Sequence, residues 1–148
     1  MEFRSTHTQT TTTMSDHTAL IRQANQEIIV EGKLSNVSMY FDESYCVHAS
    51  EKDYGGHDFI KQFVKQLRRS IDNISLLGVR VLVSNGDLVA WQRSLKGTFE
   101  NAMRGIPASG NSITWHEQLV SKFVEGKIVE EWVVSDLAGQ LMLSLSKK

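Results

Sequence analysis

The stretch Ser112–Asp136, SITWHEQLVSKFVEGKIVEEWVVSD, predicts two strands joined by a tight turn at Glu125-Gly126. Side chains of a strand point alternately to its two faces. On the first strand, the predicted apolar face holds Ile113, Trp115, Glu117, Leu119 and Phe123. On the second strand, it holds Ile128, Trp132, Val134 and Asp136. A carboxylate on a buried face costs several kcal/mol unless it is partnered or neutral, so Glu117 and Asp136 are the first places to look for chemistry.

The length and composition are those of one ordinary globular domain. The chain has 148 residues, of which 41% are hydrophobic and 22% are charged. The net charge of −1 gives no overall field that would attract nucleic acid or an acidic membrane. Residues 1–14 are rich in threonine and read as a disordered or vector-derived tail, and residues 15–148 are expected to form a single domain.

The chain carries no sign of membrane insertion or secretion. It has no run of 18 apolar residues, and its first residues lack the apolar core of a secretory signal. Its one cysteine, Cys46, excludes an internal disulfide and fits a reducing compartment. We therefore expect a cytoplasmic protein.

Helical patterns dominate the first half of the chain and strand patterns the second half. Helices are predicted from Asp16 to near Gly32, over 34–41, and along the apolar stripe from Phe59 to Ile71. A short strand over 45–48 and a loop over 49–56 separate the last two helices. Four long strands begin at Ile74; Asn85-Gly86 turns the first hairpin, and 101–110 forms a loop before the second. A terminal helix over 137–145 completes an α+β fold with helices on one face of a curved antiparallel sheet.

Within the first strand pair, Leu77, Val79, Val81 and Val83 alternate along one strand, and Val89, Trp91, Leu95 and Phe99 continue on the returning strand. Arg93 is the exception among the apolar residues of that returning face.

Three segments together resemble the SnoaL-like polyketide cyclases, members of the nuclear-transport-factor-2-like superfamily. They are GDLVAWQRSLKGTF (86–99), RGIPASGNSITW (104–115) and KFVEGKIVEEWVVSDLAGQL (122–141). The resemblance implies a cone-shaped, cystatin-like sheet with three helices packed on it and a deep apolar pocket inside. It also implies a homodimer built through the sheet.

The same resemblance implies an intramolecular aldol closure without metal or cofactor. Asp136 occupies the position of the family's acid/base, near the end of the last strand. Glu117 and Leu119 stand where the cyclases carry a glutamine and a histidine. Val47 stands in place of a pocket asparagine, with His48 beside it. These departures leave the substrate open.

The residues themselves support such chemistry, each with a structural alternative. Forming an enolate requires a base with a raised pKa and a donor to the oxygen that becomes negative. Asp136 is the candidate base, a protonated Glu117 the candidate donor, and His48 a further candidate base. The alternatives are a helix N-cap for Asp136, a salt bridge to Arg93 for Glu117, and a hydrogen-bonded structural role for His48.

Large apolar side chains are expected to line the pocket and bind a hydrophobic substrate. The candidates are Tyr40, Phe63, Trp91, Met103, Trp115, Leu119 and Trp132. The histidines have no zinc-like spacing and no phosphate-binding glycine loop is present, so neither metal nor cofactor is expected. The predicted function is a cofactor-independent cyclase or isomerase of a hydrophobic carbonyl compound; the alternative is a non-catalytic domain that binds a small apolar ligand.

Overall fold

The computed structural model describes residues 16–50 and 52–147, so the tail expected over 1–14 lies outside the described residues. Residues 16–24 form an α-helix that continues as the π-helix η1 (Asn25–Val30). The next elements are η2 (Leu34–Asn36), α2 (Val37–Tyr40), β1 (Phe41–Ala49), β2 (Lys52–Gly55) and α3 (Gly56–Ser70). The second half contains β3 (Ile71–Asn85), β4 (Leu88–Phe99), β5 (Ser112–Val124), β6 (Lys127–Ser135) and α4 (Leu137–Ser144).

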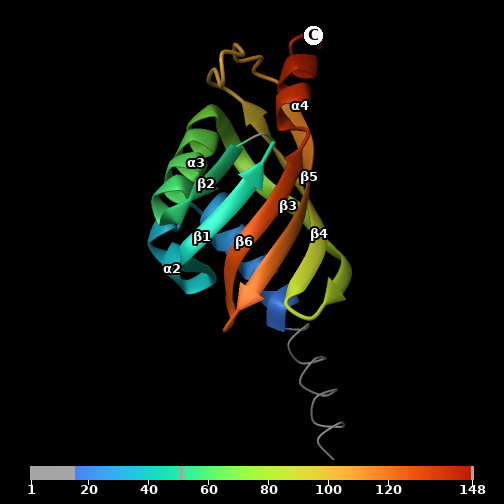
Figure 1. The fold of residues 1–148 in the computed structure, drawn as a ribbon. Helices are drawn as coiled ribbons and strands as arrows, with labels where there is room; N and C mark the ends of the chain where they lie inside the picture. Colours follow the sequence, from blue (N-terminus) through green and yellow to red (C-terminus); the bar gives the residue numbers. More distant parts are fainter. Residues whose placement is uncertain (1–15, 51, 148) are drawn as a thin grey trace, which may run out of the picture.

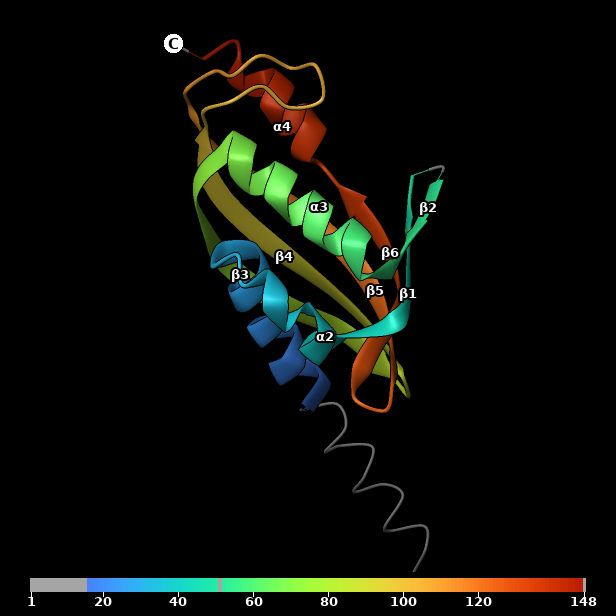
Figure 2. The ribbon, with the colours of Figure 1, turned by 90° about the vertical axis from the view of Figure 1, so that its left-hand side faces the viewer.

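The six strands form one curved sheet in the order β2-β1-β6-β5-β4-β3 (Figure 1). The sheet bends around α3 and the first helical segment, which cover its inner face (Figure 2). This is the predicted α+β architecture. Two details correct the prediction: β1 runs parallel to β6, and the expected loop over 49–56 contains β2, which pairs with β1. The short edge strand β2 is exposed along its whole length, so it has no apolar alternation that would reveal it in the sequence.

The apolar pattern of β5 and α3 matches their packing. Every residue predicted on the inner face of β5 is buried, from Ile113 at 4% exposure to Phe123 at 3%. Along α3, Ile60, Val64 and Leu67 are buried against the sheet. These two elements form the centre of the core because each presents one continuous apolar face.

Strand β3 departs from the predicted alternation. Its pairing with β4 shifts register at three places, between Asp72 and Ser75, between Leu76 and Gly78, and between Val81 and Val83. Each extra residue reverses the face that later side chains point to. As a result Val79 is buried, whereas Leu77 and Val83, which the alternation placed on the same face, are exposed.

The other connections follow the prediction. Gly86 takes a positive φ in the turn between β3 and β4, the conformation that Asn-Gly turns favour. Residues 101–110 form the loop between β4 and β5, and α4 packs back with Leu137 and Leu141 buried. Within the described part of the chain, no helix is long and apolar enough to cross a membrane.

Candidate functional site

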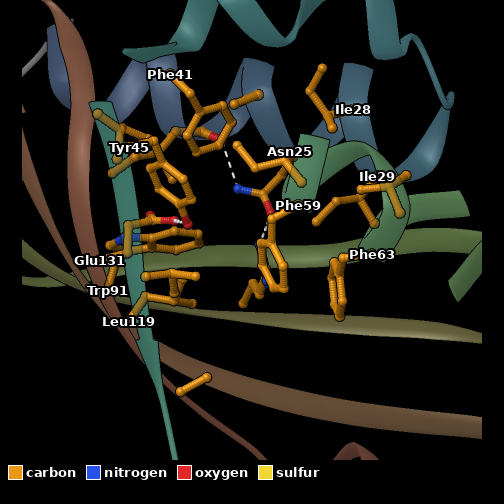
Figure 3. Close-up of a pocket in the computed structure, with 18 residues that line it drawn as sticks. Asn25, Ile28, Ile29, Phe41, Tyr45, Phe59, Phe63, Trp91, Leu119 and Glu131 are labelled. Atoms are coloured by element: carbon orange, nitrogen blue, oxygen red, sulfur yellow. Dashed lines mark hydrogen bonds between the residues drawn. The ribbon is translucent and has the colours of Figure 1, made fainter. Parts of the chain in front are cut away.

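An apolar cavity of about 110 Å³ lies between the helices and the inner face of the sheet. Most of its wall is aliphatic and aromatic, and Phe41, Phe59 and Phe63 stand around it (Figure 3). Polar atoms reach the wall from Asn25, Tyr45, Arg93 and Glu131. A mostly apolar hollow with a few converging polar groups is the usual form of a small-molecule site.

Glu131 is the carboxylate of this cavity, and it is held by a chain of hydrogen bonds. The Tyr45 hydroxyl donates to Glu131 Oε1 at 2.7 Å, and the Ser121 hydroxyl donates to Oε2 at 2.5 Å. The indole N–H of Trp91 donates to Ser121 Oγ at 2.9 Å. The carboxyl group therefore has a fixed position beside the cavity, with its tyrosine partner also on the cavity wall (Figure 3).

A β-bulge turns Glu131 inward. Lys122 of β5 pairs with Glu130 of β6, but the next residue, Phe123, pairs with Ile128, so Val129 is an extra residue in β6. Beyond this bulge the inward positions of β6 are those opposite the inward positions of β5. Glu131 lies directly opposite the buried Ser121, which explains their hydrogen bond.

Burial sets the protonation chemistry of this pair. Glu131 is 5% exposed, and loss of solvent raises the pKa of its carboxyl group. Hydrogen bonds from Ser121 and Tyr45 and the charge of Arg93 offset part of this rise. Burial and the neighbouring carboxylate also raise the pKa of Tyr45, which therefore stays a protonated donor. A carboxyl group with a raised pKa can take up and return a proton near neutral pH.

A second polar cluster joins Arg93, Glu117 and Asn25. Arg93 Nε donates to Glu117 Oε1 at 2.7 Å, and Nη1 donates to Asn25 Oδ1 at 2.7 Å. Arg93 Nη2 forms an ion pair with the same Glu117 oxygen at 2.6 Å. Arg93 and Glu117 are direct partners across β4 and β5. The salt bridge considered as the alternative role for Glu117 is thus confirmed, and the Glu117 carboxylate is not among the groups lining the cavity. Asn25 begins η1, and π-helical turns often occur at functional sites.

The structure divides the predicted substrate-binding residues into three groups. Phe63, Trp91 and Leu119 line the cavity. Tyr40, Met103 and Trp115 are buried but do not line it. Trp132 is 40% exposed, because the bulge in β6 turns it to the outer face of the sheet.

Asp136 is not in an apolar hollow, and this part of the prediction is wrong. Its side chain is 44% exposed, and it accepts a hydrogen bond from the backbone N–H of His116 at 2.7 Å. The prediction placed Asp136 on the same face as Ile128 because it assumed an uninterrupted two-residue alternation along the strand. The extra residue Val129 reverses this alternation. Asp136 stands at the N-cap position of α4, although its carboxylate makes no cap hydrogen bond to the helix.

His48 also lies away from the cavity. Its ring contacts Asp53 through Nδ1 and Glu130 through Nε2, both at 2.6 Å, and it stacks on Trp132. The hydrogen bond to Glu130, followed by the one to Asp53, raises the pKa of His48 above 6.5. These contacts give His48 a structural role in joining β1 to β2 and β6, on the outer face of the sheet.

An NMR titration of the His48 ring is expected to give a pKa above 6.5. Because the folded pKa is raised, His48 stabilises the fold fully below pH 6.5, and this contribution is lost as the pH rises through the folded value. Glu130→Gln and Asp53→Asn should each lower the pKa of His48, and Glu43→Gln, an exposed acid elsewhere on β1, should not. A pKa of His48 at or below 6.5 in the unchanged protein would contradict the proposed role of its hydrogen bonds to Glu130 and Asp53.

The prediction missed Glu131, Tyr45 and Asn25 as site residues. The adjacent pair Glu130-Glu131 is the one available signal, because two consecutive residues of a regular strand point to opposite faces. One of these two acids had to face inward. The prediction placed Trp132 on the inner face, and the same alternation placed Glu131 on the outer face.

The curved sheet, the helices in its concavity and the apolar cavity between them define the class of α+β protein to which the chain belongs. The sequence matches the SnoaL-like polyketide cyclase family over residues 19–142, and the chain belongs to this family. The fold is nuclear-transport-factor-2-like, as the resemblance implied. A search of curated proteins finds no match.

Several solved structures share the fold at low sequence identity. AclR from Streptomyces galilaeus is 19% identical, with a TM-score of 0.75 over 91% of this chain and 98% of AclR. TsrD from Streptomyces laurentii is 16% identical, with a TM-score of 0.74 over 89% and 96%. A SnoaL-like polyketide cyclase from Agrobacterium tumefaciens is 17% identical, with a TM-score of 0.67 over 85% and 95%.

Proposed function

We propose that this protein is a cofactor-independent enzyme that moves a proton at the carbon next to a carbonyl group. The reaction class is an intramolecular aldol cyclisation, or a related isomerisation, of a hydrophobic carbonyl compound held in the cavity. The observation that carries the proposal is the Glu131–Tyr45 pair, a buried acid and a protonated donor on one apolar wall.

In the first step, the Glu131 carboxylate takes the α-hydrogen as a proton, and the electron pair of the C–H bond moves to form an enolate. The protonated Glu131 can then donate to the Tyr45 oxygen, which frees the Tyr45 hydroxyl to donate to the enolate oxygen. In a cyclisation, the enolate carbon forms a bond to a second carbonyl carbon of the same molecule. The new alkoxide takes its proton back from Glu131, so no other reactant is needed.

Asp136 remains the competing acid, because it occupies the family's acid/base position. Its exposure argues for Glu131, since an exposed carboxylate is not desolvated in the way that general-base chemistry on a weak carbon acid requires. The proposal therefore differs from the sequence-based prediction in the acid, not in the reaction.

The test is hydrogen–deuterium exchange of 2-indanone, a compact ketone with acidic α-hydrogens, followed by NMR in D₂O. Saturable exchange above the buffer rate would support the enzyme. Binding of the ketone, measured by calorimetry, without any exchange would instead favour the non-catalytic ligand-binding domain. In that case Glu131 and Tyr45 would serve only as hydrogen-bond partners for each other. A protein with Tyr45→Phe, which keeps the ring but not the donor, should exchange more slowly.

We further propose that the protein is a cytoplasmic homodimer formed through the outer face of the sheet. The strand registers align His48, Trp132, Val120, Ala90 and Val83 in one row across this face. Trp132 and Val83 in this row are 40% and 60% exposed, and neighbouring Val134 is 75% exposed. Exposed apolar side chains gathered on a sheet favour contact with a second copy.

Sedimentation equilibrium is expected to show a dimer that Val134→Asp converts to a monomer, because a carboxylate would have to be buried in the interface. Val124→Asp is the matched control, since Val124 is similarly apolar and 46% exposed but lies at the end of the β5–β6 hairpin. A monomer in the unchanged protein at all concentrations would contradict the proposed assembly.

A further inference from the structure

A wider hollow of about 850 Å³ adjoins the cavity on the side of α3. Ala49, Phe59 and Phe63 line both spaces, so the hollow and the cavity share one apolar boundary. The rest of the hollow is formed by residues after β1, by the polar face of α3 and by Arg104 in the loop between β4 and β5. In Figure 2 the β1–β2 hairpin and this loop lie at the two ends of α3.

The hollow is positively charged. Its cationic side chains are those of Lys52, Lys65, Arg69 and Arg104. No described residue that lines it is acidic, although the whole chain has 17 acidic residues against 16 lysines and arginines. Among the described residues, none of the four cations forms a salt bridge. Like charges left together without partners repel one another, and an anion placed among them removes that repulsion.

The two faces of α3 divide between the two spaces. Phe59 and Phe63 reach the cavity, whereas Gln62, Lys65, Gln66 and Arg69 line only the hollow. The last four are spaced at i, i+3, i+4 and i+7, so they form one polar stripe along the helix. A molecule that extends past Phe59 and Phe63, which line both spaces, would meet an apolar wall on one side and a wall of amides and cations on the other.

We infer that the ligand of the cavity is amphipathic and carries an anionic group, a carboxylate or a phosphate, on an arm that lies in the basic hollow. This inference rests on the proposed function only in that the cavity holds a small molecule. The apolar body would gain from leaving water, and the anion would remain partly hydrated among the cations. The class of substrate is thus a hydrophobic carbonyl compound with an acidic arm, rather than a neutral one.

Calorimetry with a matched pair of probes tests this inference. 6-Phenylhexanoate and its neutral amide have the same ring and the same chain, and differ in the charge of the end group. The carboxylate is expected to bind at least about 10-fold more tightly than the amide at low salt, and the difference should shrink in 0.5 M NaCl. Benzoate, whose charge is too close to its ring, should show no such preference over benzamide. 6-Phenylhexyl phosphate tests which anion the hollow prefers. If the natural arm is a phosphate, this probe should bind more tightly than 6-phenylhexanoate.

Two triple variants with the same change in net charge locate the effect. Lys65→Gln, Arg69→Gln and Arg104→Gln together should reduce the preference for the carboxylate to below about 3-fold while leaving the affinity for the amide unchanged. Arg80→Gln, Lys96→Gln and Lys127→Gln together remove three exposed cations outside the hollow and should leave the preference intact. All six positions are exposed, and thermal unfolding of both variants checks that the fold is kept.

Several results would overturn the inference. Equal affinity for 6-phenylhexanoate and its amide would show that the hollow does not select anions, and the proposed enzyme with a neutral substrate would stand. A preference that survives the hollow variant, or that falls equally in the control variant, would place the anion elsewhere or show only a general charge effect. If neither probe binds while 2-indanone still exchanges, the hollow does not extend the site; if nothing binds or exchanges, the proposed function fails as well.

Discussion

Glu131→Gln is expected to lower the turnover number for α-hydrogen exchange of 2-indanone by at least about 100-fold. Glutamine keeps the size of glutamate and an oxygen that can accept from Tyr45, but it cannot take a proton from carbon. Affinity for the ketone should change little, since the apolar wall is unaltered, and the loss should therefore appear in kcat rather than in KM. NMR exchange rates over a range of ketone concentrations separate the two.

The adjacent residue supplies a matched control for this variant. Glu130→Gln makes the same chemical change one position earlier on β6, where the side chain points outward to His48, and should keep exchange within about twofold. Asp136→Asn tests the competing acid. If Asp136→Asn stops exchange and Glu131→Gln does not, the acid/base is the one that the family resemblance indicates.

The pH dependence gives an independent test of Glu131. Because burial raises the pKa of Glu131 and the carboxylate is the base, kcat/KM should increase with pH through that raised pKa. Stability should change in the opposite sense: the folded protein holds this proton to a higher pH than the unfolded chain, so Glu131 lowers stability as the pH rises through its folded pKa. Glu131→Gln should remove both dependences.

Arg93→Leu is expected to lower the free energy of unfolding by about 3–5 kcal/mol, the largest stability effect predicted here. The side chains of Arg93 and Glu117 are only 11% and 6% exposed, so removing the cation leaves a buried carboxylate without its partner. The same change also removes the donor to Asn25 Oδ1 at the start of η1. Urea denaturation followed by tryptophan fluorescence measures the loss.

The double variant Arg93→Leu with Glu117→Leu separates the cost of an orphaned charge from the loss of packing. Replacing both partners of a buried ion pair by apolar groups costs far less than removing one, so the double variant should be clearly more stable than Arg93→Leu alone. Lys33→Leu, which breaks the exposed pair with Glu31, should leave the urea midpoint nearly unchanged. A midpoint for Arg93→Leu equal to that of the unchanged protein would show that the buried pair contributes no stability.

The central elements could be predicted because their patterns are local and uninterrupted. The inner face of β5 and the stripe along α3 each repeat with the period of their own backbone, so burial follows from residue spacing alone. The turn at Gly86 and the helix beginning at Leu137 likewise depend on neighbouring residues. The buried partner of Glu117 could also be proposed, since Arg93 is a polar exception on a strand that pairs with β5.

The acid of the cavity could not be located in the same way. One extra residue, Val129, reverses the face of everything after it on β6, and the composition of the segment carries no mark of the bulge. The parallel pairing of β6 with β1 joins two segments that lie far apart in the chain. Tyr45 meets Glu131 only through that pairing.

Periodicity and turn chemistry therefore suffice for the α+β class, the positions of the long strands and the main helix, and the residues of the central core, because each depends on contacts within a few residues. The identity of the cavity acid, the outward position of Asp136 and the basic hollow beside α3 depend on strand register and on segments brought together from distant parts of the chain. A register shift of one residue changes no local preference but exchanges the buried and exposed faces, so only the folded arrangement distinguishes Glu131 from its neighbours.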